Sequence, residues 1–208
     1  MSEKTPETII EKIAKYSAGL EAVSRKRRRD FHKYPETAWL EMRTSAIIAE
    51  TLTELGYEVL TGRQVCLEEA RMGVPEKTVL EKHAEMVLEQ GVPGEYLTEE
   101  MRQGFTGVIG ILRCGEGPVV ALRFDIDALG LIEEKTEKHR PFAEGFSSEN
   151  YGMMHACGHD AHGAMGLGIA QVLMEIKDQL HGTVKLIFQP GEEGARGARG
   201  IVAHGHLD

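Results

Sequence analysis

The feature of this sequence that most restricts its fold is a dense cluster of side chains able to bind metal, His155-Ala156-Cys157-Gly158-His159-Asp160-Ala161-His162. A carboxylate pair, Glu192-Glu193, follows after one apolar helical pattern and one apolar strand pattern. Thiolate and imidazole are ligands that transition metals prefer, and paired carboxylates suit metal bridging and general-base work. The fold is therefore expected to bring these two separated segments to one site.

The apolar patterns around this cluster predict an α/β fold. Residues 108–112 and 119–124 are predicted strands, and the segment 114–118 between them has the composition of a hairpin turn. Residues 184–188 form a third, mainly apolar strand pattern, which follows a helical pattern over residues 165–180. Helices that alternate with strands predict an α/β sandwich, in which ligands bind beyond the ends of the strands.

The first half of the chain is mainly helical in pattern. Apolar residues recur at helical spacing over residues 9–31 and again over 47–55, where Gly56 follows as a C-terminal cap. Residues 57–60 are a predicted short strand. The segment 66–104 is polar and helix-prone, so we expect a helical insert on the domain surface, without a chemical motif of its own.

Composition excludes several classes of function. The chain has 208 residues, enough for one sizeable domain, with 24 basic and 33 acidic residues and a net charge of −9. This charge and an aromatic content of 6% argue against nucleic-acid binding. No apolar run approaches the roughly 20 residues of a membrane helix. Cys66, Cys114 and Cys157 form no C-x-x-C pair, so we expect a cytoplasmic protein without a disulfide framework.

A second carboxylate pair ends the predicted strand 119–124. In an extended segment, Asp125 and Asp127 of Asp125-Ile126-Asp127 project to the same side of the chain. One carboxylate would bind a metal while the other orients a ligand imidazole. A cap at the end of the strand explains the same residues equally well, so both interpretations stay open at this point.

Cys157 and His159 are two residues apart, so in an extended segment both can bind one metal or a close pair. Glu192 and Glu193 are adjacent, so their side chains diverge, and one can bind metal while the other accepts a proton from water. A buried thiol beside a capping histidine, and an exposed acidic turn, are the simpler alternatives. The two segments taken together favour a metal site.

Other residues near the cluster are weaker candidates. His162 is expected in the first turn of the following helix, where it could bind metal or support a ligand. His155 is expected to be a packed, hydrogen-bonded core histidine. Arg196 and Arg199 are candidates for binding a substrate carboxylate, with a plain ion-paired loop as the alternative.

Several segments carry motifs that occur together in one enzyme family: Arg28-Arg29-Asp30-Phe31-His32, Arg123-Phe124-Asp125-Ile126-Asp127-Ala128-Leu129, Met153-Met154 with the cluster 155–162, and Leu186-Ile187-Phe188-Gln189-Pro190-Gly191-Glu192-Glu193-Gly194. They resemble the signatures of the M20 metallopeptidase family, in its amidohydrolase branch, which hydrolyses N-acyl amino acids. Within the insert, Arg71-Met72-Gly73-Val74-Pro75 and Gly104-Phe105-Thr106-Gly107 resemble the A subunits of p-aminobenzoyl-glutamate hydrolases.

The resemblance implies a zinc-peptidase-like α/β/α catalytic domain with a mixed sheet and a site for two divalent metal ions. Mn or Zn is the expected metal, with Co or Ni as alternatives. By resemblance, Cys157, His159 and Glu193 are metal ligands, and Glu192 is the general base. Asp127 matches the carboxylate that steadies the metal site, and Asp125 lies beside it. The expected substrate is an N-acyl amino acid, with p-aminobenzoyl-glutamate favoured.

Members of this family are longer than this chain. We expect residues 1–208 to be the N-terminal part of the catalytic domain. The lid or dimerisation domain, the C-terminal part of the catalytic domain and further ligand histidines are expected to be absent. The expected partner is a second copy or a second hydrolase subunit. The alternative hypothesis is a non-catalytic remnant that folds and at most binds metal or another subunit.

Overall fold

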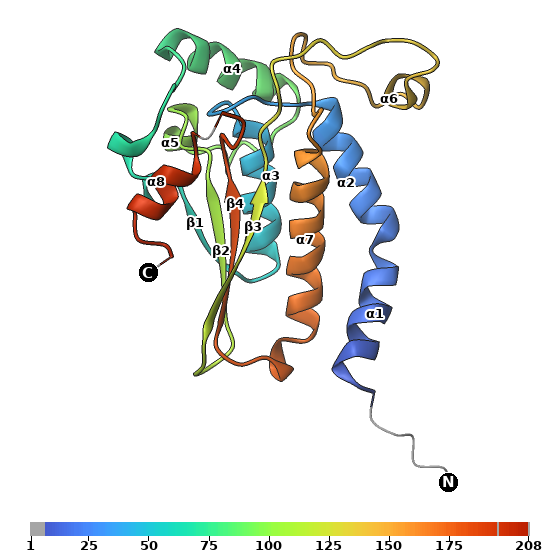
Figure 1. Cartoon of the computed structure of the whole chain (residues 1–208), viewed down its shortest axis with the longest axis vertical. Coiled ribbons are helices and arrows are strands. Elements are labelled where there is room, and N and C mark those ends of the chain that lie inside the picture. The colour runs from blue at the N-terminus through green and yellow to red at the C-terminus, as the bar shows by residue number, and fades with distance from the viewer. Residues whose placement is uncertain (1–6, 195, 208) are drawn as a thin grey trace.

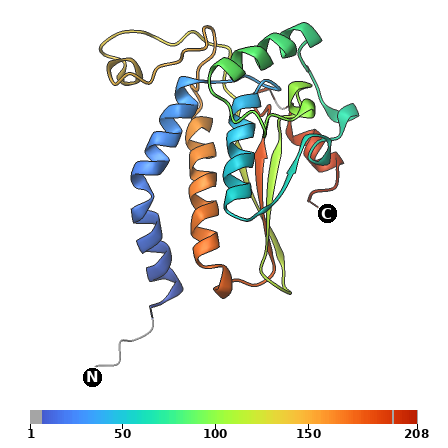
Figure 2. The same ribbon diagram turned by 180° about the vertical axis from the view of Figure 1, so that it is seen from behind.

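The computed structural model describes residues 7–194 and 196–207, and within them four strands form a mixed sheet with helices on both faces (Figures 1 and 2). The strands lie in the order β1-β2-β4-β3, in which β3 and β4 are parallel and the other neighbours are antiparallel. They are β1 (Glu58–Thr61), β2 (Val108–Arg113), β3 (Val119–Asp125) and β4 (Thr183–Gln189). The helices are α1 (Ile9–Gly19), α2 (Glu21–Lys33), α3 (Met42–Glu54), α4 (Lys77–Glu89), α5 (Glu99–Arg102), α6 (Arg140–Ala143), α7 (His159–Glu175) and α8 (Ala198–Ala203), with 3₁₀ turns η1 (Gly62–Gln64), η2 (Glu68–Ala70) and η3 (Lys177–Gln179).

The two faces of the sheet are covered by different helices. Leu186 and Phe188 of β4 belong to the larger core, to which α3 and α7 also contribute; Figure 2 shows these two helices side by side along one side of the strands. Ile187, between them in sequence, packs on the other face with Ile201 of α8. Alternate residues of one strand thus point to opposite helical layers, as expected for a buried strand. This arrangement confirms the predicted α/β/α fold with a mixed sheet.

Strands β2 and β3 do not form the hairpin predicted from the turn residues 114–118. Strand β4 lies between them and pairs with both. The first residues of β4 are hydrogen-bonded to the turn between β2 and β3. The Cys114 amide donates to Gly182 O at 2.8 Å, and the Thr183 amide donates to Pro118 O at 2.9 Å. The turn residues explain why the chain reverses between β2 and β3. They do not indicate that β4, which comes later in the sequence, pairs between these two strands. The hairpin prediction is therefore wrong.

Helix α7 packs closely on the sheet because it has glycine at a contact position. A Cβ atom at Gly166 would lie 2.6 Å from Cε1 of Phe188 and 2.8 Å from Cδ2 of Phe124. Both rings are buried, and their centroids are 5.3 Å apart. The glycine therefore determines how closely α7 approaches the sheet, and it fixes the position of the N-terminus of α7, where the metal-binding cluster begins.

The N-terminal helical pattern forms two helices rather than one, which meet at Leu20. Thr8 caps α1 through a capping box with Glu11. No residue of α1 is buried, and Ile10 is 75% exposed, whereas α2 buries Phe31 against α7. The periodicity thus predicted helix correctly, but the apolar face of its first half remains largely exposed.

The segment 66–104 contains η2, α4 and α5, in agreement with its helix-prone composition. Gly91 follows the end of α4 with a φ of +73°, a conformation that glycine adopts without strain. Leu80 and Val87 of α4 are buried in the core beside α3. Its assignment as an insert within one domain, residues 1–208, remains a prediction.

Candidate metal centre

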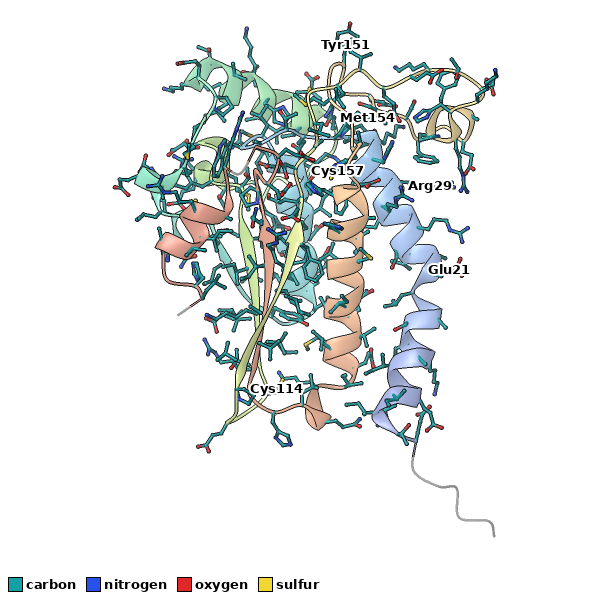
Figure 3. The ribbon with its side chains drawn as sticks, viewed as in Figure 1. Glu21, Arg29, Cys114, Tyr151, Met154 and Cys157 are labelled. Carbon is teal, nitrogen blue, oxygen red and sulfur yellow. The ribbon has the colours of Figure 1, made fainter. Side chains whose placement is uncertain are left out.

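The two carboxylate pairs meet at one edge of the sheet. Strands β3 and β4 are parallel and in register, with Asp125 opposite Gln189, so the residues that follow each strand emerge side by side. Helix α7 begins at the same end with His159. Cys157 lies just before it, at the opposite end of the sheet from Cys114 (Figure 3). The parallel pairing thus brings together the segments that the sequence marked as chemically active.

Asp127 determines the orientation of His159. Nδ1 of His159 lies 2.9 Å from the backbone carbonyl oxygen of Asp127 and 3.3 Å from its carboxylate Oδ1. In the neutral ring, Nδ1 carries the proton and donates it to the carbonyl, so that Nε2 is the nitrogen available to a metal ion that displaces the second proton. The other carboxylate oxygen, Oδ2, accepts a hydrogen bond from the Glu193 amide at 3.0 Å. One residue thus aligns the imidazole with the segment between β4 and α8, which carries Glu192 and Glu193 and which we name the glutamate loop.

Two groups of donor atoms converge on His159. Cys157, His159 and Glu193 each offer a ligand atom, and these atoms lie within 4.8 Å of one another. His159 forms a second group, within the same limit, with Asp125 and His162. Nδ1 of His162 lies 3.6 Å from Oδ2 of Asp125. Sulfur, nitrogen and oxygen donors are therefore available at one place.

The donor set fits a divalent transition metal. Among the described residues, two buried carboxylate oxygens of this site have no hydrogen-bond donor, Oδ1 of Asp125 and Oε1 of Glu193, and Oδ1 of Asp127 has only the 3.3 Å contact with Nδ1 of His159. A buried charged oxygen without a partner is costly, and a bound cation removes that cost. Thiolate, imidazole and carboxylate together favour Zn²⁺ and similar ions over Mg²⁺ or Ca²⁺.

The site is strongly negative, as the pKa of His159 shows. Burial alone would lower this pKa, but hydrogen bonds to Asp127 and the charges of Asp127 and Asp125 outweigh burial and raise it to about 9. A cluster that stabilises a positive imidazole to this extent also attracts a cation from solution. The electrostatics therefore agree with the donor set.

Glu192 and Glu193 diverge, as adjacent residues must. While Glu193 joins the donor group with Cys157, Oε2 of Glu192 lies 3.7 Å from Nε2 of His159. The Glu192 side chain is 38% exposed, so solvent reaches it on one side while the donor cluster lies on the other. A carboxylate in this position is able to exchange protons with a water molecule at the site.

Glu41 is a buried carboxylate near the site that the sequence reasoning missed. It accepts hydrogen bonds from the Gly191 amide at 2.8 Å and from Oγ1 of Thr106 at 2.6 Å. Burial, followed by the charge of Asp127, raises the pKa of Glu41 well above its usual range. It fixes the start of the glutamate loop. No local motif marks Glu41, because both of its partners are distant in sequence.

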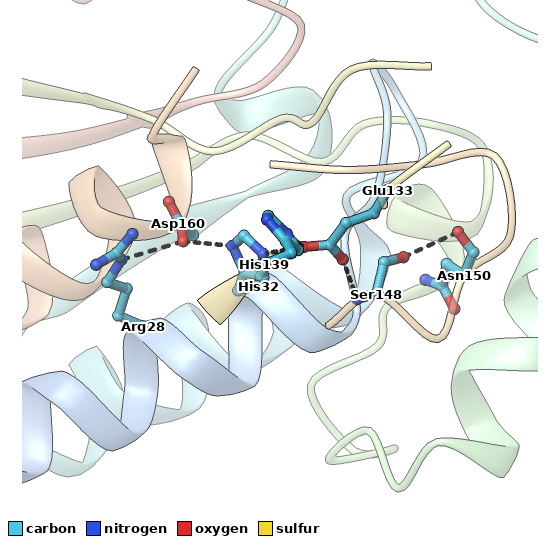
Figure 4. A network of polar contacts seen from close by, with 7 residues as sticks. All are labelled: Arg28, His32, Glu133, His139, Ser148, Asn150 and Asp160. Carbon is cyan, nitrogen blue, oxygen red and sulfur yellow. Dashed lines mark hydrogen bonds and ion pairs between the residues drawn. The ribbon is translucent and has the colours of Figure 1, made fainter. Parts of the chain in front are cut away.

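A buried histidine links α2, α7 and the loop that follows β3 (Figure 4). Nδ1 of His32 lies 2.9 Å from Oδ2 of Asp160, and Nε2 lies 2.9 Å from Oε1 of Glu133; we name these three residues the His32 bridge. Burial lowers the pKa of His32, but hydrogen bonds to the two carboxylates outweigh burial and raise it. Because Asp160 follows His159, the bridge holds the N-terminus of α7 against α2. No pattern in the sequence indicates this pairing beyond the motif that contains His32.

His155 is buried as predicted, but it lacks the predicted hydrogen bonds to the residues that the structure describes. Neither ring nitrogen has a hydrogen-bond partner among them, so its prediction as a hydrogen-bonded histidine is wrong. Burial lowers the pKa of His155 to about 4, so the ring is neutral. The reason is competition, because the nearby Asp160 carboxylate is already bonded to His32 and Arg28.

The two candidate arginines lie in different environments. Both residues are exposed, but only Arg196 lines a pocket of about 390 Å³ beside Glu193, whereas Arg199 lies on α8 outside that lining. Within the part of the chain that the structure describes, neither guanidinium pairs with a carboxylate. The ion-paired loop considered as the alternative is therefore not observed.

The α/β/α fold with a mixed sheet, and the thiolate, imidazole and carboxylate donors beyond its strand ends, agree with the class of metallopeptidases that the sequence resembles. Residues 121–208 match the model of peptidase family M20/M25/M40. Over these residues the chain is similar to this M20 peptidase family, and the relatives below extend the similarity to most of the chain.

The most similar relatives include two hydrolases of amino-acid conjugates. The chain is 49% identical over 182 residues to the A subunit of p-aminobenzoyl-glutamate hydrolase from Escherichia coli K12, and 50% identical over 182 residues to indole-3-acetyl-aspartic acid hydrolase of Enterobacter agglomerans. Each match covers 87% of this chain and 42% of the relative. The chain thus spans less than half the length of the relatives that it matches.

Solved structures show the same relationship. An aminobenzoyl-glutamate utilization protein from Klebsiella pneumoniae superposes with a TM-score of 0.76 at 38% identity, over 93% of this chain and 42% of that one. The Bacillus subtilis YXEP protein, a dinuclear metal-binding peptidase of the M20 family, superposes with a TM-score of 0.66 at 31% identity, over 92% and 41% of the two chains. Both matches support the fold.

Two further predictions concern the environment of the protein. Among the described helices, none is long and apolar enough to span a membrane. Cys66, Cys114 and Cys157 are all free thiols. The prediction that no disulfide framework exists is confirmed.

Proposed function

We propose that the chain is the N-terminal part of a metal-dependent amidohydrolase domain, with residues 66–104 as an insert, and that it cleaves the amide bond of an N-acyl or N-aroyl amino acid. The observation that carries the proposal is the convergence of Cys157, His159 and Glu193 beside Glu192. The favoured substrate is p-aminobenzoyl-glutamate, because relatives named for this compound and for indole-3-acetyl-aspartic acid are 49% and 50% identical to the chain.

Cys157, His159 and Glu193 are the proposed ligands of a divalent metal ion, and Asp125 and His162 are candidates to bind a second ion or to support the first. When bound, such an ion polarises a carbonyl and makes water more acidic. Mn or Zn suits this mixture of donors, with Co or Ni as alternatives. The other steps belong to side chains of the chain itself.

Glu192 is the proposed general base. Its carboxylate accepts the proton of the attacking water and then returns that proton to the nitrogen of the leaving amine. Asp127 acts through His159, because its carbonyl and carboxylate hold the Nδ1 proton and so keep Nε2 free. Arg196 and Arg199 are candidates for the carboxylate of the substrate.

We also propose the setting of the activity. The Escherichia coli relative is one subunit of a hydrolase, so the expected partner is a second copy of the chain or a second hydrolase subunit. The free cysteines favour the cytoplasm, where thiols stay reduced. The other proposed ligand is a small charged substrate, with no role for nucleic acid or a membrane.

The test is the release of p-aminobenzoate from p-aminobenzoyl-glutamate by the purified chain, with and without added Mn²⁺ or Zn²⁺. We expect metal-dependent release that is abolished in Glu192→Gln, while bound metal is retained. Glu175→Gln, at the exposed far end of α7, is the matched control and keeps the parent rate. Equal turnover by Glu192→Gln and the parent contradicts the general-base role. No release from the folded parent favours the non-catalytic remnant.

A further inference from the structure

A pocket of about 390 Å³ opens directly beside the proposed metal ligand Glu193. One wall comes from the glutamate loop, through Glu193 and Arg196. The facing wall comes from the segment 66–104, through Gly73 and Pro75. The predicted insert, which carries no chemical motif in the sequence, therefore contributes directly to a cavity next to the candidate metal centre.

Within this pocket the guanidinium of Arg196 lies against Gly73. A Cβ atom at Gly73 would be 3.3 Å from one terminal nitrogen of Arg196 and 3.4 Å from its Cζ. Gly73 also has a φ of +67°, which disfavours any other residue. The absence of a side chain at Gly73 thus makes the space that the guanidinium occupies. No carboxylate within residues 7–194 and 196–207 pairs with this guanidinium.

The segment that carries Gly73 is held firmly. Nε1 of Trp39 donates to Met72 O at 2.8 Å. Trp39 is fully buried with a φ of +67°, a strained conformation for a large residue. On the other side, Arg71 donates to Gln103 O at 3.1 Å, and its guanidinium stacks over Phe105 at 3.4 Å from the ring centroid. Gly73 is therefore a fixed support for Arg196.

We propose that this pocket is a subsite for a carboxylate of the amino-acid part of the substrate, that Arg196 binds this carboxylate, and that Gly73 of the insert positions Arg196. The inference rests on the proposed function and adds to it the group that the insert helps to recognise. A planar guanidinium forms paired hydrogen bonds with a carboxylate. Because the negative Glu193 lines the same pocket, an anion binds there only when a divalent cation offsets that charge.

The test compares binding of p-aminobenzoyl-glutamate with binding of its neutral diamide, in which both carboxylates are amides. Isothermal titration is carried out in Mn²⁺ on the 208-residue chain carrying Glu192→Gln, which binds the substrate without cleaving it and serves as the parent of the variants below. We expect the parent to bind the dianion at least about tenfold more tightly, as for a charged hydrogen bond. Arg196→Ala loses most of this preference, and Arg196→Lys keeps part of it, because it retains the charge without the paired geometry. Arg113→Ala, at the exposed end of β2, is the matched control and keeps the preference.

The role of Gly73 has its own matched control. Gly91 lies in the same segment with a φ of +73°, and a Cβ atom there would meet nothing within 4 Å. Gly73→Ala and Gly91→Ala therefore introduce similar backbone strain, but only the first places a methyl group against a guanidinium, 3.3 Å from its nearest nitrogen. We expect Gly73→Ala to lose the carboxylate preference and Gly91→Ala to retain it. Equal loss in both variants overturns the positioning role of Gly73.

Mn²⁺ binding, measured on the same samples, distinguishes a failure of the proposed subsite from a failure of the proposed function. If Mn²⁺ binds and Arg196→Ala keeps the full carboxylate preference, the subsite is wrong while the proposed function stands. A parent that binds Mn²⁺ but shows no carboxylate preference overturns the subsite in the same way. A folded parent that binds no Mn²⁺ contradicts the proposed function, and this inference fails with it.

Discussion

Replacing Gly166 with alanine is expected to destabilise the chain and to weaken its metal site together. Helix α7 packs on the sheet at this residue, where a Cβ atom would lie 2.6 Å from Phe188 and 2.8 Å from Phe124. Phe188 is fully buried and Phe124 is 8% exposed, so neither ring can turn into solvent. The helix must therefore shift or the rings must leave their preferred positions.

The magnitude follows from two opposing effects. Alanine in place of glycine inside a helix gains about 1 kcal/mol from helix propensity. Forcing a methyl group into a packed core costs about 1–3 kcal/mol. Gly168, on the same helix, is the matched control, because a Cβ atom there would lie 3.4 Å from Oγ of Ser24, a side chain at a partly exposed position. Both variants gain propensity, so the difference between them measures the overpacking alone.

Urea unfolding at equilibrium is the assay. We expect Gly166→Ala to be less stable than Gly168→Ala by about 1–3 kcal/mol. The affinity for Mn²⁺ is expected to fall in Gly166→Ala only, because α7 begins with His159. Equal unfolding free energies in the two variants would refute the argument that glycine sets the distance between α7 and the sheet.

Three further predictions concern single side chains. The raised pKa of His32 means that its contribution to stability is complete below the pKa of an unfolded histidine, about 6.5, and is lost as pH rises through the higher folded pKa. Urea unfolding of His32→Asn should thus show a larger loss at about pH 5.5 than at about pH 9, with exposed His181→Asn as the control. Asp127→Asn is expected to lower Mn²⁺ affinity by about 10- to 100-fold in a titration; unchanged affinity contradicts its orienting role. Iodoacetamide should label the exposed Cys157, and bound Zn²⁺ should protect it. Cys66 should remain unlabelled, because it is buried and burial raises its pKa to about 11. Mass spectrometry that finds Cys66 labelled before Cys157 refutes this prediction.

Much of the arrangement around the site could be predicted from the sequence, because local pattern determines where strands end. The apolar runs located β3 and β4, and the carboxylates that follow them lie at one edge of the sheet, since the two strands are parallel. The cluster that contains Cys157 and His159 runs into the first turn of α7, which begins at His159 and includes His162, as expected for that residue. These features depend on residues close together in the chain.

The features that the sequence did not reveal depend on distant pairs. The hairpin prediction failed because β4 pairs between β2 and β3, a choice made by residues far from the turn. The His32 bridge joins residues from three separate segments, so no local spacing announces it. Likewise, Gly73 and Arg196 meet only in the folded chain, which is why the polar segment 66–104 carried no chemical signal.

The central claim is that Cys157, His159 and Glu193 form a metal centre, and the most direct test is metal binding by the chain itself. Electron paramagnetic resonance of free Mn²⁺ follows its uptake by the parent, by Cys157→Ser, by His159→Asn and by the control His181→Asn. We predict saturable uptake by the parent and the control, and strong loss in the two ligand variants. Uptake that is equal in all four proteins, or absent in the folded parent, would contradict the account.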